Sequence, residues 1–262
     1  MSDPLLLERD GPVLTLRLNR PVLHNALDPT LIEALTRALL DAGGDDGIRA
    51  VVLAGAGASF CAGADLQRMR AMADAGEHEN LADALALARL MRTLDELPRP
   101  TIARVHGAAF GGGVGLVACC DIAIASPQAR FGLSESRLGL LPAVISPYVV
   151  AAIGARQARR WFATAEPFDA GTALQIGLVH QEVPASQLDL AVARQVELLL
   201  AVAPQAAAMA KALVRKTAAG GDGHAQDRDN AALIAHLRAS AEGREGLSAF
   251  LDKRPPAWAA RE

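Results

Sequence analysis

Hydrophobic and polar residues alternate near the start of the chain, where Leu14, Leu16 and Leu18 are separated by Thr15 and Arg17. This period of two is typical of a strand with one buried face. Short runs of apolar residues without alternation predict further strands, buried on both faces, at 50–54, 101–105 and 122–125. Between the strands, apolar residues at helical spacing predict helices over 29–40 and 80–97.

The pattern after residue 146 is helical almost throughout. It predicts helices at 146–152, 155–164, 169–176, 185–202, 205–218, 225–239 and 241–251. Strand–helix units followed by helices indicate an α/β core with a helical C-terminal region. We therefore expect one domain, with a core over 1–200 and a helical region over 201–262.

Composition excludes several classes of protein. The 262 residues are 51% hydrophobic and 21% charged, which allows a large core and excludes disorder or a coiled coil as a global description. A net charge of −3 and 3% aromatic residues count against a nucleic-acid partner. Residues 138–155 carry no charge, but Pro142 and Pro147 interrupt this run, so we interpret it as buried loop and helix rather than as a membrane span.

The three cysteines cannot form a disulfide framework. Cys119 and Cys120 are adjacent, and core packing is favoured over a role as nucleophile. No CxxC or HxxxH spacing is present, so no metal site is predicted. Free thiols and an N-terminus without the pattern of a secretory signal predict a reducing, cytoplasmic location.

Glycine gathers in two places, 55–63 and 107–115. The first is not a dinucleotide fingerprint, because Phe60 stands where a third small residue is required. The second contains Gly111, Gly112 and Gly113 directly before an apolar helical segment, 114–120. Unpaired N–H groups at such a helix start could hold an anion or a developing oxyanion. A tight turn for close packing is an equal alternative.

Two acidic residues follow the second glycine cluster. Asp121 leads directly into a predicted strand, so a structural role in the turn is favoured. Glu135 lies between apolar residues and glycines, where a raised pKa would suit a general acid or base. Taken alone, the residues favour a surface glutamate paired with Arg130 or Arg137.

Several motifs, in this order, together resemble the enoyl-CoA hydratase/isomerase (crotonase) superfamily. They are residues 62–66 (AGADL), 106–113 (HGAAFGGG), 121–123 (DIA) and 131–135 (FGLSE), with 19–21 (NRP) and 25–27 (NAL) before them and 245–254 (EGLSAFLDKR) after them. Each motif is weak alone, but the series is specific and covers nearly the whole chain.

The resemblance implies a crotonase-like spiral of ββα units with a C-terminal helical region used for trimerisation, giving a trimer or a dimer of trimers. It implies an acyl-CoA substrate, no separate cofactor and no membrane partner. The N–H groups of Ala64 and Gly112 would hold the thioester oxygen, and Glu135 would be catalytic. The positions matching substrate or CoA contacts are Ala26, Ala62, Asp65, Leu66, Phe250 and Lys253. Those of the C-terminal tail are expected to act from a neighbouring subunit.

One departure from the family matters for the reaction. Hydratases of the family carry two glutamates about 20 residues apart, and here the first position is Gly115 whereas the second is Glu135. A bacterial subgroup, the methylglutaconyl-CoA and isohexenylglutaconyl-CoA hydratases, resembles this chain at 113–121 and 141–148 and shares that glycine. We therefore expect hydration of a branched 2-enoyl-CoA. A Δ3,Δ2-enoyl-CoA isomerase is the alternative, and a non-catalytic binding protein is less favoured.

Overall fold

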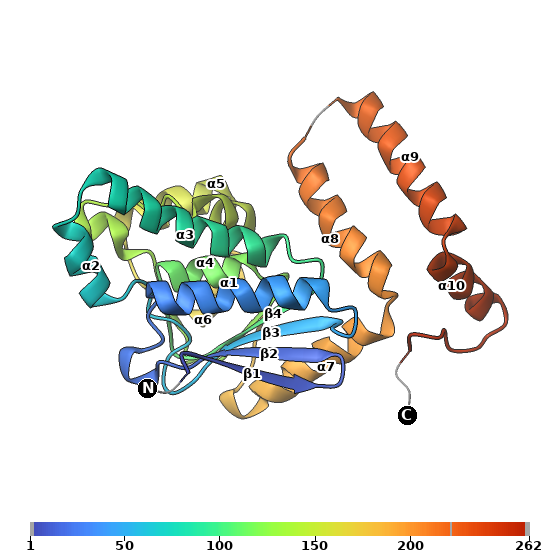
Figure 1. Cartoon of the computed structure of the whole chain (residues 1–262), viewed down its shortest axis with the longest axis horizontal. Coiled ribbons are helices and arrows are strands. Elements are labelled where there is room, and N and C mark those ends of the chain that lie inside the picture. The colour runs from blue at the N-terminus through green and yellow to red at the C-terminus, as the bar shows by residue number, and fades with distance from the viewer. Residues whose placement is uncertain (1–2, 221, 260–262) are drawn as a thin grey trace.

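The computed structural model describes residues 3–220 and 222–259. Its central layer is a sheet with the strand order β1-β2-β3-β4-β6-β9 (Figure 1). The strands are β1 (Leu5–Asp10), β2 (Val13–Leu18), β3 (Ala50–Gly55), β4 (Thr101–Val105), β6 (Ile122–Ala125) and β9 (Gln181–Glu182). β1 and β2 pair antiparallel, and every other neighbouring pair in this sheet is parallel.

A second, smaller sheet carries the glycine-rich segment of the chain. It consists of β5 (Ala108–Phe110), β7 (Arg130–Gly132) and β8 (Phe168–Asp169). β5 pairs parallel to β7, and β7 pairs antiparallel to β8. Isolated bridges join Leu27 to Ala64 and Cys61 to Ala109, so two loops distant in sequence are held against this sheet and against each other.

Ten α-helices and three short 3-10 helices complete the described part of the chain. The α-helices are α1 (Pro29–Gly44), α2 (Leu66–Ala73), α3 (Glu77–Asp95), α4 (Gly112–Cys119), α5 (Ser146–Thr164), α6 (Ala170–Gln175), α7 (Leu188–Ala201), α8 (Pro204–Ala218), α9 (Gly223–Ala239) and α10 (Ala241–Leu251). The 3-10 helices are η1 (Pro21–Leu23), η2 (Ser134–Leu138) and η3 (Ala185–Gln187).

The central sheet is covered on both faces. In β3, Val51 and Leu53 belong to the main core with residues of α1, whereas Val52 packs in a second cluster with Leu188 and Val192 of α7. Because successive side chains of a strand point to opposite faces, a strand covered on both sides must be apolar at every position. This explains the unbroken apolar run at 50–54, and every residue of β3 is buried.

The predicted strands and helices are confirmed, with bounds that shift by a few residues. The separate helices expected at 146–152 and 155–164 form one element, α5, broken at Gly154, which has φ +75°. The helix expected from 185 begins with η3 before α7. The sequence pattern missed β1, α2, β5, β7, β8 and β9. Most of these missed strands have two or three residues, which is too short to show a period.

The last three helices project from the body of the molecule (Figure 1). Two basic residues in the second half of α8 join it to the body: Lys211 Nζ lies 2.9 Å from Asp121 Oδ2, and Arg215 Nη1 lies 2.8 Å from the carbonyl oxygen of Asp95. The division between core and helical region near residue 200 stays a prediction. In the described residues no single helix is long and apolar enough to cross a membrane. The segments 185–201 and 204–218 reach that length and apolar character only when taken together, and they are bent by 105° relative to each other.

Candidate active site

The first half of the site is the loop between β3 and α2. Its backbone is held by Leu27, whose N–H donates to the Gly63 carbonyl at 2.7 Å and whose carbonyl accepts from the Asp65 N–H at 3.0 Å. These bonds engage both neighbours of Ala64 and leave its own N–H facing away from Leu27. That N–H has no acceptor within the described part of the chain, and Ala64 is exposed. A free donor is therefore presented to solvent by a backbone that is hydrogen-bonded on both sides.

The second half is the start of α4. Gly111 has φ +47°, a conformation that favours glycine, and it turns the chain from β5 into the helix. Gly112 is the first helical residue, and its N–H also finds no acceptor among the residues described. The two halves are in contact, since a Cβ atom on Gly112 would lie 2.8 Å from Leu27 Cδ1 and one on Gly63 would lie 2.8 Å from the Phe110 carbonyl oxygen. The glycines therefore let two free N–H groups come close together.

The third component is Glu135, in η2. Its Oε1 lies 3.0 Å from where a Cβ atom of Gly111 would stand, so the carboxyl group is beside the residue that precedes Gly112. Its Oε2 is buried and has no hydrogen-bond partner among the residues that the structure describes. Burial raises the pKa of Glu135, and a backbone hydrogen bond only partly opposes this.

The interpretation of Glu135 as a surface ion pair is wrong. Arg130 donates to the carbonyl groups of Pro127 and Ala129 instead, and Arg137 is exposed. No cation of the described residues lies within ion-pair distance of Glu135. A desolvated carboxyl group without a charge partner is a recurrent feature of general acids and bases.

Gly115 lies one turn further along α4, and its surroundings are closed. A Cβ atom there would overlap Ile145 Cγ2 and would lie 3.0 Å from Ile145 Cβ and 3.1 Å from Met91 Cε. Both apolar side chains are buried, Ile145 at 2% exposure and Met91 at 0%. The space that a second carboxylate would need is therefore filled by hydrocarbon. Of the two glutamate positions of the family, only that of Glu135 carries a carboxyl group here.

The remaining predicted contact residues fall into two groups. Ala26 and Ala62 flank the first loop, and Leu66 is 73% exposed at the start of α2. The carboxylate of Asp65 is used within the fold, since it caps α2 through the N–H groups of Gln67 and Arg68. Contacts of these residues with CoA stay predictions.

Phe250 and Lys253 lie at the other end of the molecule. Phe250 is 80% exposed at the end of α10, and Lys253 is exposed just beyond it. Figure 1 shows α10 far from α2, so within one chain these residues do not reach the loop that carries Ala64. A role in the site would require a neighbouring subunit.

Other candidate residues have structural roles. Asp121 accepts hydrogen bonds from the N–H and Oγ1 of Thr101 at 2.7 and 2.8 Å, which confirms the role in the turn. The three cysteines are buried and unpaired, and burial raises the pKa of Cys61 and of Cys120 to about 12. The described residues include no group of His, Cys, Asp and Glu side chains placed to hold a metal ion.

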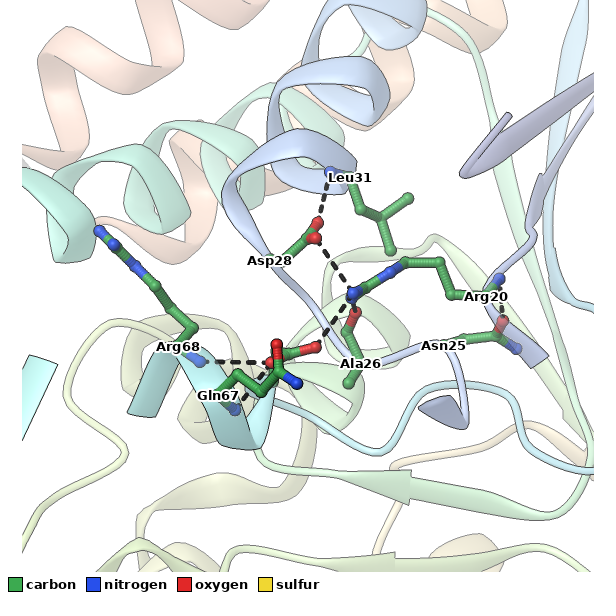
Figure 2. Close-up of polar contacts among 8 residues, drawn as sticks. Arg20, Asn25, Ala26, Asp28, Leu31, Gln67 and Arg68 are labelled. Atoms are coloured by element: carbon green, nitrogen blue, oxygen red, sulfur yellow. Dashed lines mark hydrogen bonds and ion pairs between the residues drawn. The ribbon is translucent and has the colours of Figure 1, made fainter. Parts of the chain in front are cut away.

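Sequence reasoning assigned no role to Arg20 or to the buried Asn25. The Nη2 atom of Arg20 lies 3.0 Å from a carboxylate oxygen of both Asp28 and Asp65 (Figure 2). Asn25 accepts from the Arg20 N–H at 2.9 Å and donates to the carbonyl of Ser59 at 2.7 Å. Arg20 is 8 and 45 positions from these aspartates in the sequence, and the sequence pattern did not predict α2, so no local signal showed that they meet.

The site thus combines two backbone N–H groups that have no acceptor among the described residues with a partly buried carboxyl group. The family model for enoyl-CoA hydratase/isomerase matches residues 8–261. The chain belongs to this family, the crotonases, and is an enzyme of the hydratase, or lyase, type.

Three known proteins illustrate the similarity. The 2,3-dehydroadipyl-CoA hydratase of Escherichia coli is 34% identical over 267 residues, covering 98% of this chain and 99% of that protein. The crystal structure of an enoyl-CoA hydratase from Shewanella pealeana superposes with a TM-score of 0.94 at 43% identity, covering 97% and 96% of the two chains. AtuE of Pseudomonas aeruginosa superposes with a TM-score of 0.95 at 40% identity, covering 98% and 100%. The expected α/β crotonase fold with C-terminal helices is therefore confirmed.

Proposed function

We propose that this enzyme adds water across the C2–C3 double bond of a branched 2-enoyl-CoA that carries a second carboxylate, with Glu135 as its only acid/base group. The observation that carries the proposal is the carboxyl group of Glu135, whose Oε1 lies beside Gly111 and whose buried Oε2 has no hydrogen-bond partner among the described residues, with Gly115 closed by apolar side chains. A hydratase of the two-carboxylate kind would need space at Gly115, and none is available.

One carboxylate is sufficient for both proton transfers of this reaction. Ionised Glu135 takes a proton from water while the water oxygen bonds to C3. The electron pair of the double bond moves into the thioester, and the N–H groups of Ala64 and Gly112 stabilise the resulting enolate oxygen. Glu135 then returns its proton to C2. Both the proton and the hydroxyl group arrive on the side of the substrate that faces Glu135, so we expect syn addition.

Two observations support the substrate class, the first both its branch and its carboxylate and the second its carboxylate alone. The first is the resemblance at 113–121 and 141–148 to hydratases of branched glutaconyl-CoA substrates. The second is the Escherichia coli relative, whose name denotes an enoyl-CoA with a distal carboxylate.

The test is mass-resolved turnover of crotonyl-, 3-methylglutaconyl-, isohexenylglutaconyl- and 3-enoyl-CoA side by side. A gain of one water with a glutaconyl substrate at the highest kcat/KM is expected, and Glu135→Gln should abolish it. The exposed Glu33, which pairs with Arg37 on α1, gives the matched control Glu33→Gln. Wild-type turnover in Glu135→Gln would refute the role of Glu135, and equal rates with all four thioesters would refute the substrate class.

An isomerase is the second candidate, because one carboxylate is sufficient to move a proton between C2 and C4. The same closed environment of Gly115 favours it. In the turnover experiment, isomerisation of 3-enoyl-CoA would leave the mass unchanged and move the double bond. A higher kcat/KM for that reaction than for hydration would select the isomerase.

We also propose that the protein assembles as a trimer or a dimer of trimers in the cytoplasm. Large apolar side chains on the projecting helices are exposed, among them Val214 at 67%, Phe250 at 80% and Leu251 at 76%. A second subunit would cover such a surface and would bring Phe250 and Lys253 to another site. Light scattering coupled to size-exclusion chromatography tests this, and a monomer at all concentrations would contradict it.

A further inference from the structure

The network around Arg20 joins the starts of two helices. Arg20 follows β2, and its side chain is 16% exposed. Its Nη2 is 3.0 Å from Oδ2 of Asp28 and 3.0 Å from Oδ2 of Asp65, and its Nη1 donates to the carbonyl of Ala26 (Figure 2). One guanidinium therefore contacts three groups from two separate segments of the chain.

Both aspartates use their second oxygen as an N-cap. Oδ1 of Asp28 accepts from the Leu31 N–H at 2.8 Å, and Oδ1 of Asp65 accepts from the Gln67 N–H at 2.9 Å. Burial acts to raise the pKa of Asp65, but hydrogen bonds from Arg68, Arg20 and Gln67 outweigh it and the pKa is lowered. Asp65 is therefore held as a charged group at 6% exposure.

Leu27 directly precedes Asp28, and Ala64 directly precedes Asp65. Leu27 and Ala64 form the β-bridge in which the Ala64 N–H has no acceptor among the described residues. Arg20 thus holds the C-terminal side of both bridge strands at once. A rotation of either loop would tilt the Ala64 N–H away from the position beside Gly112.

We infer that Arg20 is a positioning residue, which aims the Ala64 N–H at the thioester oxygen through Asp28 and Asp65. This inference rests on the proposed oxyanion hole. The competing explanation is that Arg20 only stabilises two N-caps, which would affect folding and leave catalysis unchanged.

The experiment compares Arg20→Lys and Asp65→Asn with wild type. Lysine keeps the charge but lacks the forked geometry, and asparagine is as good an N-cap as aspartate but loses the ion pair. Asp169 caps α6 through the Thr172 N–H at 2.8 Å, so Asp169→Asn is the matched control. The readouts are kcat, KM and the infrared C=O stretch of bound crotonyl-CoA labelled with ¹³C at the carbonyl carbon. A lower stretching frequency on binding reports hydrogen bonding to the thioester oxygen.

We expect kcat to fall about tenfold or more in both variants, since losing a whole oxyanion donor costs about 10²–10³. KM should change less than twofold, and the shift of the C=O stretch should shrink. Asp169→Asn should match wild type in both. Wild-type kcat and an unchanged C=O shift in Asp65→Asn would overturn the inference, even if Arg20→Lys does not fold. If wild type shows no C=O shift with crotonyl-CoA and no turnover of any of the four thioesters named above, the proposed function fails and the inference fails with it.

Discussion

The closed environment of Gly115 makes a sharp prediction about α4. In Gly115→Ala the new methyl group overlaps Ile145 Cγ2 and approaches Met91 Cε at 3.1 Å. Overpacking a core by one methyl group costs about 1–3 kcal/mol. Alanine recovers about 1 kcal/mol of helix propensity relative to glycine. A net loss of about 1 kcal/mol follows, which is a Tm decrease of about 2–4 °C for a chain of this size.

A double-mutant cycle assigns that loss to Ile145. Ile145→Ala removes Cγ2 and by itself costs about 2–5 kcal/mol, but it should make Gly115→Ala neutral or stabilising. Ile145→Val is the matched control, because valine keeps both γ carbons and should leave the cost of Gly115→Ala unchanged. The free energy of unfolding from urea titration is the measurement.

The same environment decides whether a second carboxylate can be restored. Gly115→Glu would place an unpaired carboxyl group in an apolar wall, and we expect a protein that is strongly destabilised and gains no hydratase activity. A Gly115→Glu protein with wild-type Tm and higher turnover would refute the reasoning, because it would require open space at this position.

Three further predictions follow from the site. Because burial raises the pKa of Glu135, kcat/KM should fall as pH decreases through a value above the ordinary 4.5, and a pH–rate profile checks this. The raised pKa also means that Glu135 favours the folded state only at low pH, and this contribution to stability is lost as pH rises through the pKa of the folded state. Glu135→Gln should therefore raise Tm more at pH 8 than at pH 5. The opposite order would contradict the burial of this carboxyl group. Ala64→Pro removes an N–H that has no acceptor among the described residues and should lower kcat about 10²–10³-fold with little change in Tm, whereas Ala62→Pro removes a bond to the His24 carbonyl and should lower Tm.

The fold was predictable where its signal was periodic. The alternation of Leu14, Leu16 and Leu18 gave β2, and the uniform apolar run at 50–54 gave β3, because burial on one or both faces dictates those patterns. The strands β5 and β7 were missed because three residues cannot show a period. α2 was missed because none of its residues is buried, and it therefore lacks an apolar stripe.

The candidate site was predictable through its glycines and its glutamate, yet the residues alone left their roles open. The run from Gly111 to Gly113 was equally consistent with a tight turn and with an anion site, and Glu135 was consistent with a surface ion pair. Only the packing shows that Oε2 of Glu135 is buried and that it and the N–H groups of Ala64 and Gly112 have no hydrogen-bond partner among the described residues. Those facts depend on contacts between residues far apart in the sequence, such as Leu27 with Ala64 and Gly63 with Phe110, which a local pattern cannot show.

By itself the sequence determined the order of the core elements, the residue types at the site and the absence of a carboxylate at position 115, because each is a property of local composition and spacing. The tertiary structure decided that Ile145 and Met91 close that position and that Arg20 joins Asp28 to Asp65. Steric exclusion and ion pairing act between atoms that meet only after the chain has folded, so a pattern along the sequence cannot show them.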